Sequence, residues 1–304
     1  TENGLKYGAY LELQASTSDG ANADEVNLWL EGNWGRVELG DQDGAGSQLA
    51  VVGPYVGIGQ AMGSYNDFVP SADRGYRNSE TAGDPYFKAI DTLDATKVTY
   101  YTPRFSGFQA GVSYAPERDS GANGEDVQFF DNVGNHDNAY ELGLNYKNEF
   151  SNGVKLNVGG EYVGADAKDG SGLEDISSWS LGAQVGYMGF TFGGGYSSYG
   201  DSGLATGVAS DDVTIWNAGL TYESGAWGVG ANFVQVDFDD NGVPFEVTGA
   251  TGAGGTYTAY GIGGTYKLAP GLSAGADLVF FDRNRDAGAD TDGYVLVTEV
   301  KAAF

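Results

Sequence analysis

Hydrophobic and polar residues alternate along most of this 304-residue chain, in runs of about ten residues. The run at residues 294–304 is the clearest: Glu299 and Lys301 share one face, and Tyr294 and Phe304 end the opposite face. This pattern is poorly suited to a soluble core and is typical of a strand between lipid and water. Similar runs occupy residues 5–14, 140–147, 154–163, 179–187, 190–196, 216–222, 227–235, 257–268 and 272–281.

The inward positions of these runs are small, polar or charged, which predicts a water-filled interior. No uncharged apolar stretch approaches the roughly 18 residues of a membrane helix. A membrane protein built from strands must close into a barrel, because backbone groups in lipid cannot stay unpaired. The alternation gives about fourteen strands. Their inward polar positions include Glu141, Asn145, Lys147, Lys155, Asn157, Glu161, Ser180, Gln184, Asn217, Thr221, Asn232, Ser273 and Asp277.

The connections between the runs alternate in length. Short ones lie at residues 150–153, 188–189, 224–225 and 269–271, and long acidic ones lie at 165–175, 200–212 and 237–255. Outer-membrane barrels have short turns on one rim and long external loops on the other. A soluble sandwich would mix the two lengths.

Residues 41–95 are the exception, since they show no sustained period of two. Loops of this length are usually functional or disordered. The apolar content of this stretch, from Leu49 to Phe68, argues against disorder and predicts packing against the inner wall of the barrel.

Composition supports a curved sheet, with 51 Gly, 20 Tyr and 15 Phe, at a mean hydropathy of −0.30. The net charge of −27 argues against a nucleic-acid partner, whose phosphates need a basic surface. Acidic residues gather in the connections, as at Asp237, Asp239 and Asp240. These clusters are either solvated loops or sites for calcium or for cations that bridge lipopolysaccharide.

Two segments carry a family resemblance: Asn-Trp-Gly-Arg-Val-Glu-Leu-Gly-Asp at residues 33–41, and Lys-Val-Thr-Tyr-Tyr-Thr-Pro at the start of residues 97–116. Together with the long loop between them, they resemble the Gram-negative general porins of the proteobacterial type, and the similarity extends over nearly the whole chain. The resemblance implies an all-β, sixteen-stranded transmembrane antiparallel barrel, with residues 1–304 as one domain and 41–95 constricting the pore. It also implies a homotrimer in the bacterial outer membrane, among lipid and lipopolysaccharide.

The family has more strands before the constricting loop than the roughly three that precede it here. This departure favours two N-terminal strands missing from the sequence, and a true fourteen-stranded barrel is the alternative. The start of the chain has no cleavable signal and looks processed or truncated.

A porin constriction sets basic side chains on the wall against acidic groups on the inserted loop. Four candidates alternate with outward apolar residues in their strands and are therefore expected on the inner wall, namely Lys6, Arg36, Glu38 and Lys97. The loop offers Asp67, Asp73, Arg74, Arg77, Asp84 and Asp91. By resemblance, Arg36 and Lys97 would face Asp67 and Asp73. The alternative is that these charges form solvated pairs with no bearing on permeation.

The residue types argue against an enzyme. The chain has no Cys and one histidine, His136, which excludes the usual zinc sites and leaves one position for a serine triad. His136 is interpreted as an ordinary loop residue.

The sequence therefore predicts a channel for passive diffusion of small hydrophilic solutes and ions, with mild cation preference and no cofactor. A solute-specific channel and a structural or adhesive anchor remain alternatives.

Overall fold

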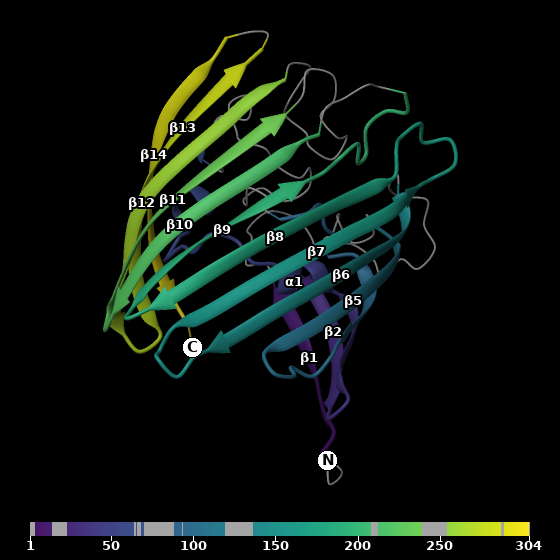
Figure 1. Ribbon diagram of the computed structural model, residues 1–304, viewed down its shortest axis with the longest axis horizontal. Helices are drawn as coiled ribbons and strands as arrows, with labels where there is room; N and C mark the ends of the chain where they lie inside the picture. Colours follow the sequence, from purple (N-terminus) through teal and green to yellow (C-terminus); the bar gives the residue numbers. More distant parts are fainter. Residues whose placement is uncertain are drawn as a thin grey trace.

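The computed structural model describes residues 4–13, 23–63, 65, 68–69, 88–92, 94–118, 136–207, 212–238, 254–286 and 289–303. Fourteen antiparallel strands form one sheet in chain order, which confirms the predicted strand number (Figure 1). The strands are β1 (Lys6–Leu13), β2 (Ala23–Gly32), β3 (Gly35–Asp41), β4 (Thr96–Tyr101), β5 (Phe108–Glu117), β6 (His136–Glu149), β7 (Lys155–Ala167), β8 (Ile176–Tyr187), β9 (Phe190–Ser198), β10 (Thr214–Ser224), β11 (Trp227–Phe238), β12 (Gly255–Ala269), β13 (Leu272–Arg285) and β14 (Thr291–Ala302).

The sheet curls around an interior (Figure 1). Each strand pairs with its neighbours in sequence, and β1 and β14 form the two edges. Within the described residues these two edge strands do not pair with each other. No helix among the described residues has the length and apolar character needed to cross a membrane.

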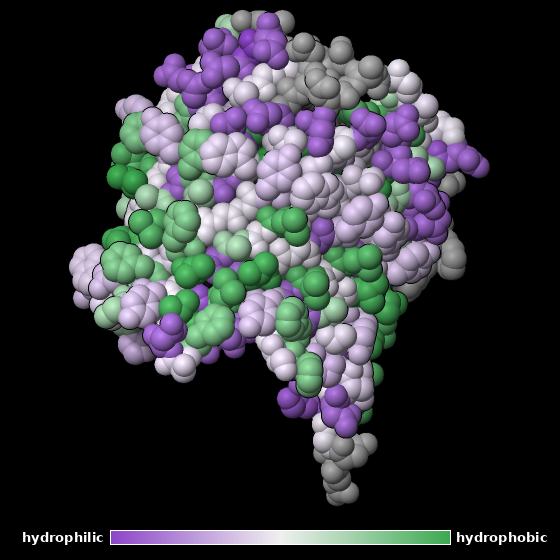
Figure 2. Space-filling model, viewed as in Figure 1, coloured by the Kyte–Doolittle hydropathy of each residue, from purple (hydrophilic) through white to green (hydrophobic). Residues whose placement is uncertain are grey.

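Alternation along the strands follows the predicted parity. In β6, Glu141 and Asn145 are buried on the inner face, whereas Leu142 and Leu144 are exposed on the outer face. Figure 2 shows hydrophobic side chains gathered across the strands and hydrophilic ones along the upper rim. An apolar outer band flanked by polar ends is what a lipid-facing barrel wall requires.

Strand connections also alternate between short and long, as predicted. The turn between β8 and β9 consists of Met188 and Gly189, with φ angles of 51° and 86°. Positive φ at both central residues gives the turn the twist of the flanking strands. The long connections meet at the opposite rim, which in outer-membrane barrels is the external one.

Part of the long stretch at residues 41–95 lies on the inner face of the sheet. It contains the short helix α1 (Ala45–Leu49), which packs on β4 to β7, and the 3-10 turn η1 (Gln60–Met62), which packs on β11 to β13. Figure 1 shows α1 behind β6 and β7. The predicted packing of this loop on the inner wall is confirmed for its described residues.

Inward glycines let the loop backbone approach the sheet. A Cβ added at Gly182 of β8 would overlap the carbonyl oxygen of Val51, and one at Gly219 of β10 would overlap that of Pro54. The absence of a side chain is therefore required at these two positions by the loop, in addition to any role in sheet curvature.

The loop narrows the predicted water-filled interior along β6 to β13. The loop covers Glu141, Asn217 and Asp277 there, and the parts of these strands near the long connections carry apolar inward residues. Val163, Ile215 and Val279 pack in one cluster with Tyr65 and Ile90 of the loop. The sequence pattern of single strands cannot show this, because the loop that fills the space comes from another part of the chain.

Candidate functional site

The inner wall binds the loop through side-chain acceptors. The carboxylate of Glu141 accepts hydrogen bonds from the backbone N–H groups of Gly46 (2.9 Å) and Ser47 (3.3 Å) in the first turn of α1. These donors have no partner within a helix, so the carboxylate satisfies them. Its other oxygen accepts from the N–H and hydroxyl of Thr92, at 2.8 and 2.6 Å. One buried residue thus holds both ends of the loop.

Further wall residues repeat this arrangement along the sheet. In each case a backbone N–H of the loop donates to a side chain that parity places inward. The pairs are Ala45 with Ser113 (2.8 Å), Gly53 with Asn217 (2.6 Å), Gln60 with Asp277 (2.7 Å), Ala61 with Asn232 (2.8 Å), Ala89 with Glu161 (2.8 Å) and Ile90 with Ser178 (2.6 Å). These bonds fix the loop against β5 to β13.

A cavity of about 790 Å³ lies between the loop and strands β1 to β5. Its lining combines charged groups with amides and aromatic rings. The charged lining residues are Glu25, Glu31, Arg36, Glu38, Asp43 and Arg104. Four carboxylates against two guanidinium groups leave this lining acidic by two charges.

Arg36 has a defined position in the cavity wall. Its Nε lies 2.5 Å from Glu38 Oε1, and its guanidinium carbon lies 4.6 Å from the centre of the Trp29 ring. A Cβ at Gly8 would come within 2.6 Å of the Trp29 ring, so the glycine makes room for the indole. The ion pair and the cation–π contact hold the guanidinium on the inner wall, as parity predicted for Arg36 and Glu38.

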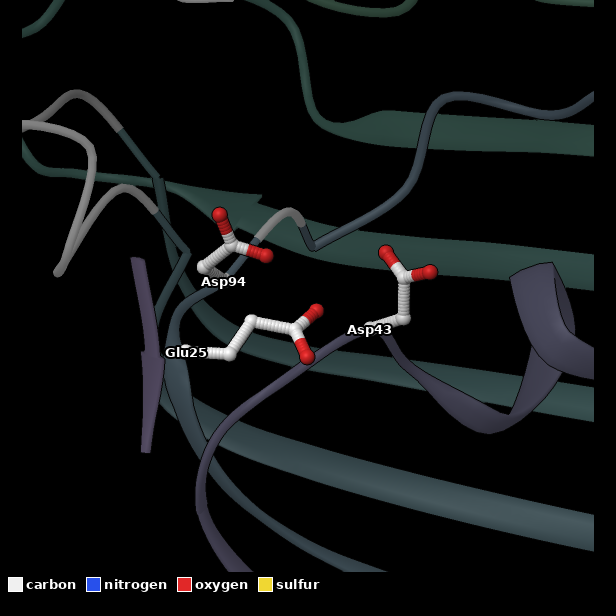
Figure 3. Close-up of side chains that lie close together, drawn as sticks. All are labelled: Glu25, Asp43 and Asp94. Atoms are coloured by element: carbon white, nitrogen blue, oxygen red, sulfur yellow. The ribbon is translucent and has the colours of Figure 1, made fainter. Parts of the chain in front are cut away.

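Three carboxylates meet at one side of this cavity. Glu25 of β2 lies between Asp43, which precedes α1, and Asp94, which precedes β4 (Figure 3). Their nearest oxygens all lie within 4.8 Å of one another. A hard divalent cation takes oxygen ligands of this kind, and the three residues could hold one.

Two wall candidates lie away from the cavity surface. Lys97 is 2 % exposed, and its ammonium donates to the carbonyl oxygen of Gln42 in the loop. Lys6 pairs with Glu31 at 2.7 Å near the start of β1. Lys97 therefore contributes to holding the loop, and only Arg36 and Glu38 of the predicted wall set line the cavity.

Asp91 is the one predicted loop residue that the structure describes. It is 3 % exposed, and Arg118 Nε donates to its carbonyl oxygen at 2.9 Å. Burial, and then the neighbouring Glu141, raises the pKa of the Asp91 carboxyl to about 7. Asp67, Asp73, Arg74, Arg77 and Asp84 lie outside the described residues, as do Asp239 and Asp240 of the predicted calcium cluster.

Two further predicted residues are placed by the structure. Asp237 of that cluster accepts a hydrogen bond from Gln235 Nε2 at 3.0 Å. His136 begins β6 and is fully buried, and its Nε2 lies 3.0 Å from the carbonyl oxygen of Glu174. The interpretation of His136 as a loop residue is therefore wrong.

Sequence reasoning missed Glu25, Trp29, Asp43 and Asp94. Parity could have found Glu25 and Trp29, because both alternate with the outward-facing Leu28 and its neighbours. Asp43 and Asp94 lie at the two ends of the non-periodic stretch, where residue types do not alternate and the sequence does not predict which way a side chain points. Only the path of the loop brings them to Glu25.

Comparisons with known proteins match this architecture. The sequence profile of the Gram-negative porins matches residues 1–286. The chain belongs to this family. Accordingly, it forms an outer-membrane channel through which solutes diffuse passively, and its location is the bacterial outer membrane.

Individual relatives are distant. The porin is 29 % identical to the major outer membrane protein P.IB of Neisseria lactamica over 149 residues, or 48 % of this chain and 35 % of that protein. It is 25 % identical to an uncharacterized protein of Rickettsia conorii over 346 aligned positions, covering 92 % of this chain and 75 % of the relative.

Solved structures support the porin barrel fold. An anion-selective porin from Comamonas acidovorans superimposes with a TM-score of 0.60 at 18 % identity, covering 99 % of this chain and 85 % of that one. The outer membrane channel DcaP of Acinetobacter baumannii gives a TM-score of 0.59 at 12 % identity, covering 99 % and 81 %. At these identities the likeness shows the fold alone.

Proposed function

We propose that the cavity between α1 and strands β1 to β5 is the narrow part of the diffusion pathway. The loop is hydrogen-bonded to β5 through β13, and the observation that carries the proposal is that charged residues line the space it leaves. Passage through such a space needs no chemical step, so we infer a channel without enzymatic turnover.

The charge of this lining favours cations. Carboxylates of Glu25, Glu38 and Asp43 outweigh the guanidinium of Arg36, which Glu38 already neutralises in part. A narrow cavity whose lining carries a net negative charge raises the local concentration of cations. Planar-bilayer recordings under a KCl gradient test this, with a reversal potential of cation-selective sign as the expected result. The opposite sign would contradict the proposed lining.

The same cavity bears on whether the channel admits many solutes or one. A lining that mixes carboxylates, guanidinium groups and amides supports general diffusion of small hydrophilic solutes. Liposome swelling with sugars of graded size should give a smooth decline with size. A single preferred sugar would indicate a solute-specific channel, and no swelling would indicate an anchor.

We further propose a homotrimer embedded in outer-membrane lipid and lipopolysaccharide, by extension from the family. The exposed apolar outer face supports a lipid or subunit contact. Sedimentation equilibrium in detergent tests the subunit number, and a monomeric mass would contradict the trimer.

Calcium is proposed as a ligand of the acidic clusters. Asp237, Asp239 and Asp240 remain the predicted external site, and Glu25, Asp43 and Asp94 offer a second set of oxygens in the cavity. Calorimetric titration with Ca²⁺ should show binding that Glu25→Gln weakens if the cavity holds the ion. If binding were lost in Asp237→Asn and kept in Glu25→Gln, the calcium ion would bind at the external cluster.

A further inference from the structure

A second hollow lies at the short-turn mouth of the channel, and its lining shares no residue with the cavity described above. It has a volume of about 410 Å³ and is lined by residues of β6, β7, β8 and β9. Lys147 and Lys155 point to the inner face, because each lies two residues from an inward asparagine on the same strand, Asn145 on β6 and Asn157 on β7. The hollow therefore opens into the lumen.

The loop marks the upper boundary of this hollow. Gln184 Nε2 donates to the carbonyl oxygen of Val52 (2.8 Å), and Asn145 Nδ2 donates to that of Leu49 (3.3 Å). Asn145 also donates to Asn157 Oδ1 at 2.9 Å. That orientation leaves the Asn157 amide nitrogen without a partner among the described residues and available as a donor.

Two ammonium groups define the chemistry of the hollow. Lys147 and Lys155 are exposed, and neither side chain has a hydrogen bond or an ion pair with any described residue. Glu149, the register partner of Lys155, is the one carboxylate in the lining. The lining therefore carries a net charge of +1 in a chain whose total is −27.

The floor of the hollow is Gly186. A Cβ there would lie 3.4 Å from Lys155 Cβ and 3.5 Å from Thr191 Oγ1, which are ordinary contact distances. The position thus tolerates a side chain, yet its glycine leaves open space between a lysine and a hydroxyl. Such a hollow presents several donors to one small anion.

The short-turn end as a whole lacks the acidic excess of the chain. Within four residues of the short connections there are five basic residues and four acidic ones, against 15 and 42 in the full sequence. They are Arg36, Arg104, Lys147, Lys155 and Lys267, with Glu31, Glu38, Glu149 and Glu223. An anion arriving at this mouth meets little of the repulsion that the acidic connections produce at the other rim.

We propose that Lys147 and Lys155, with Asn157 and Thr191 around Gly186, form a binding subsite for a small phosphate-bearing solute at the inner mouth of the porin. Lysine ammonium groups bind phosphate oxygens as point charges, and the amide and hydroxyl supply further donors. The subsite goes beyond the cation preference proposed for the constriction, because its lining on β6 to β9 shares no residue with that cavity.

Calorimetric titration of the detergent-purified porin with inorganic phosphate at low salt tests the subsite. The double variant Lys147→Gln/Lys155→Gln should raise the dissociation constant tenfold or more. Lys267→Gln removes the same charge from the same rim outside the hollow and should change it less than twofold. Gly186→Leu keeps both lysines and fills the floor, and it should also weaken binding.

Unchanged binding in the double variant, or an equal loss in Lys267→Gln, would overturn the subsite. Binding in micelles needs no conduction, so this result is independent of the pathway proposed above. In planar bilayers, phosphate added at the short-turn side should reduce the chloride current of the unaltered porin. The same addition should have little effect on the double variant.

Discussion

Gln60 and Asp277 lie 217 residues apart and are joined by two hydrogen bonds. The Gln60 N–H donates to Asp277 Oδ2 at 2.7 Å, and its side-chain Nε2 donates to Oδ1 at 2.8 Å. Gln60 begins η1 and Asp277 is an inward residue of β13, so this pair fixes the far part of the loop to the wall. Its loss should release the loop while the strand ladder stays intact.

Asp277→Ala is expected to increase single-channel conductance and current noise. Each hydrogen bond to a charged group contributes about 1.5–3 kcal/mol, and both would be removed. Glu299→Ala is the matched control, because Glu299 is an inward carboxylate of the adjacent β14 with no bond to the loop among the described residues. Equal noise in the two variants would show that Asp277 does not hold the loop.

Gly182→Ala should displace the loop in a second way. The new Cβ would overlap the Val51 carbonyl oxygen, and that oxygen belongs to backbone that cannot rotate aside. Conductance should therefore change and the urea midpoint in detergent should fall. Gly186→Ala, four residues further on the same face, meets only ordinary contacts and should leave both quantities unchanged. A silent Gly182→Ala would mean that the loop does not press on β8.

Arg36→Gln should increase cation selectivity. The substitution removes a positive charge from a cavity lining that is already acidic by two charges. A unit charge at about 4 Å in water contributes about 1 kcal/mol, so the K⁺/Cl⁻ permeability ratio should rise about fivefold. Reversal potentials measure the ratio, with Lys168→Gln as the control, since Lys168 pairs with Glu117 and neither residue lines the cavity. A fall in the ratio would exclude Arg36 from the pathway.

The buried carboxyl of Asp91 should make stability depend on pH. Its pKa is raised by burial to about 7 in the folded porin, above the value of about 3.9 expected in the unfolded chain. The folded state therefore binds the proton more tightly between these values, and stability falls as the pH rises from about 4 through 7. The steepest slope for one proton is about 1.4 kcal/mol per pH unit.

Asp91→Asn keeps the shape of the side chain and removes the titrating group. Urea unfolding in detergent micelles should show a flatter pH profile and higher stability at pH 8 than in the unaltered porin. Asp169→Asn, at an exposed turn residue, should retain the original slope. If both variants followed the unaltered profile, another buried acid would be responsible.

The alternation of residue types by itself determined the strands, the lipid-facing surface and the inward position of Arg36 and Glu38. This follows because side chains in a strand point alternately to two faces, so one strand and its composition suffice. The short and long connections could be read in the same way, and from them the two rims.

Only the tertiary structure decided what the inward residues do. Glu141, Asn217 and Asp277 have the composition of water-lining positions, yet they are buried and bind the backbone of the loop. Likewise, Asp43 meets Glu25 through the path of the loop. Contacts between a non-periodic segment and distant strands depend on how that segment packs, and local periodicity carries no information about such packing.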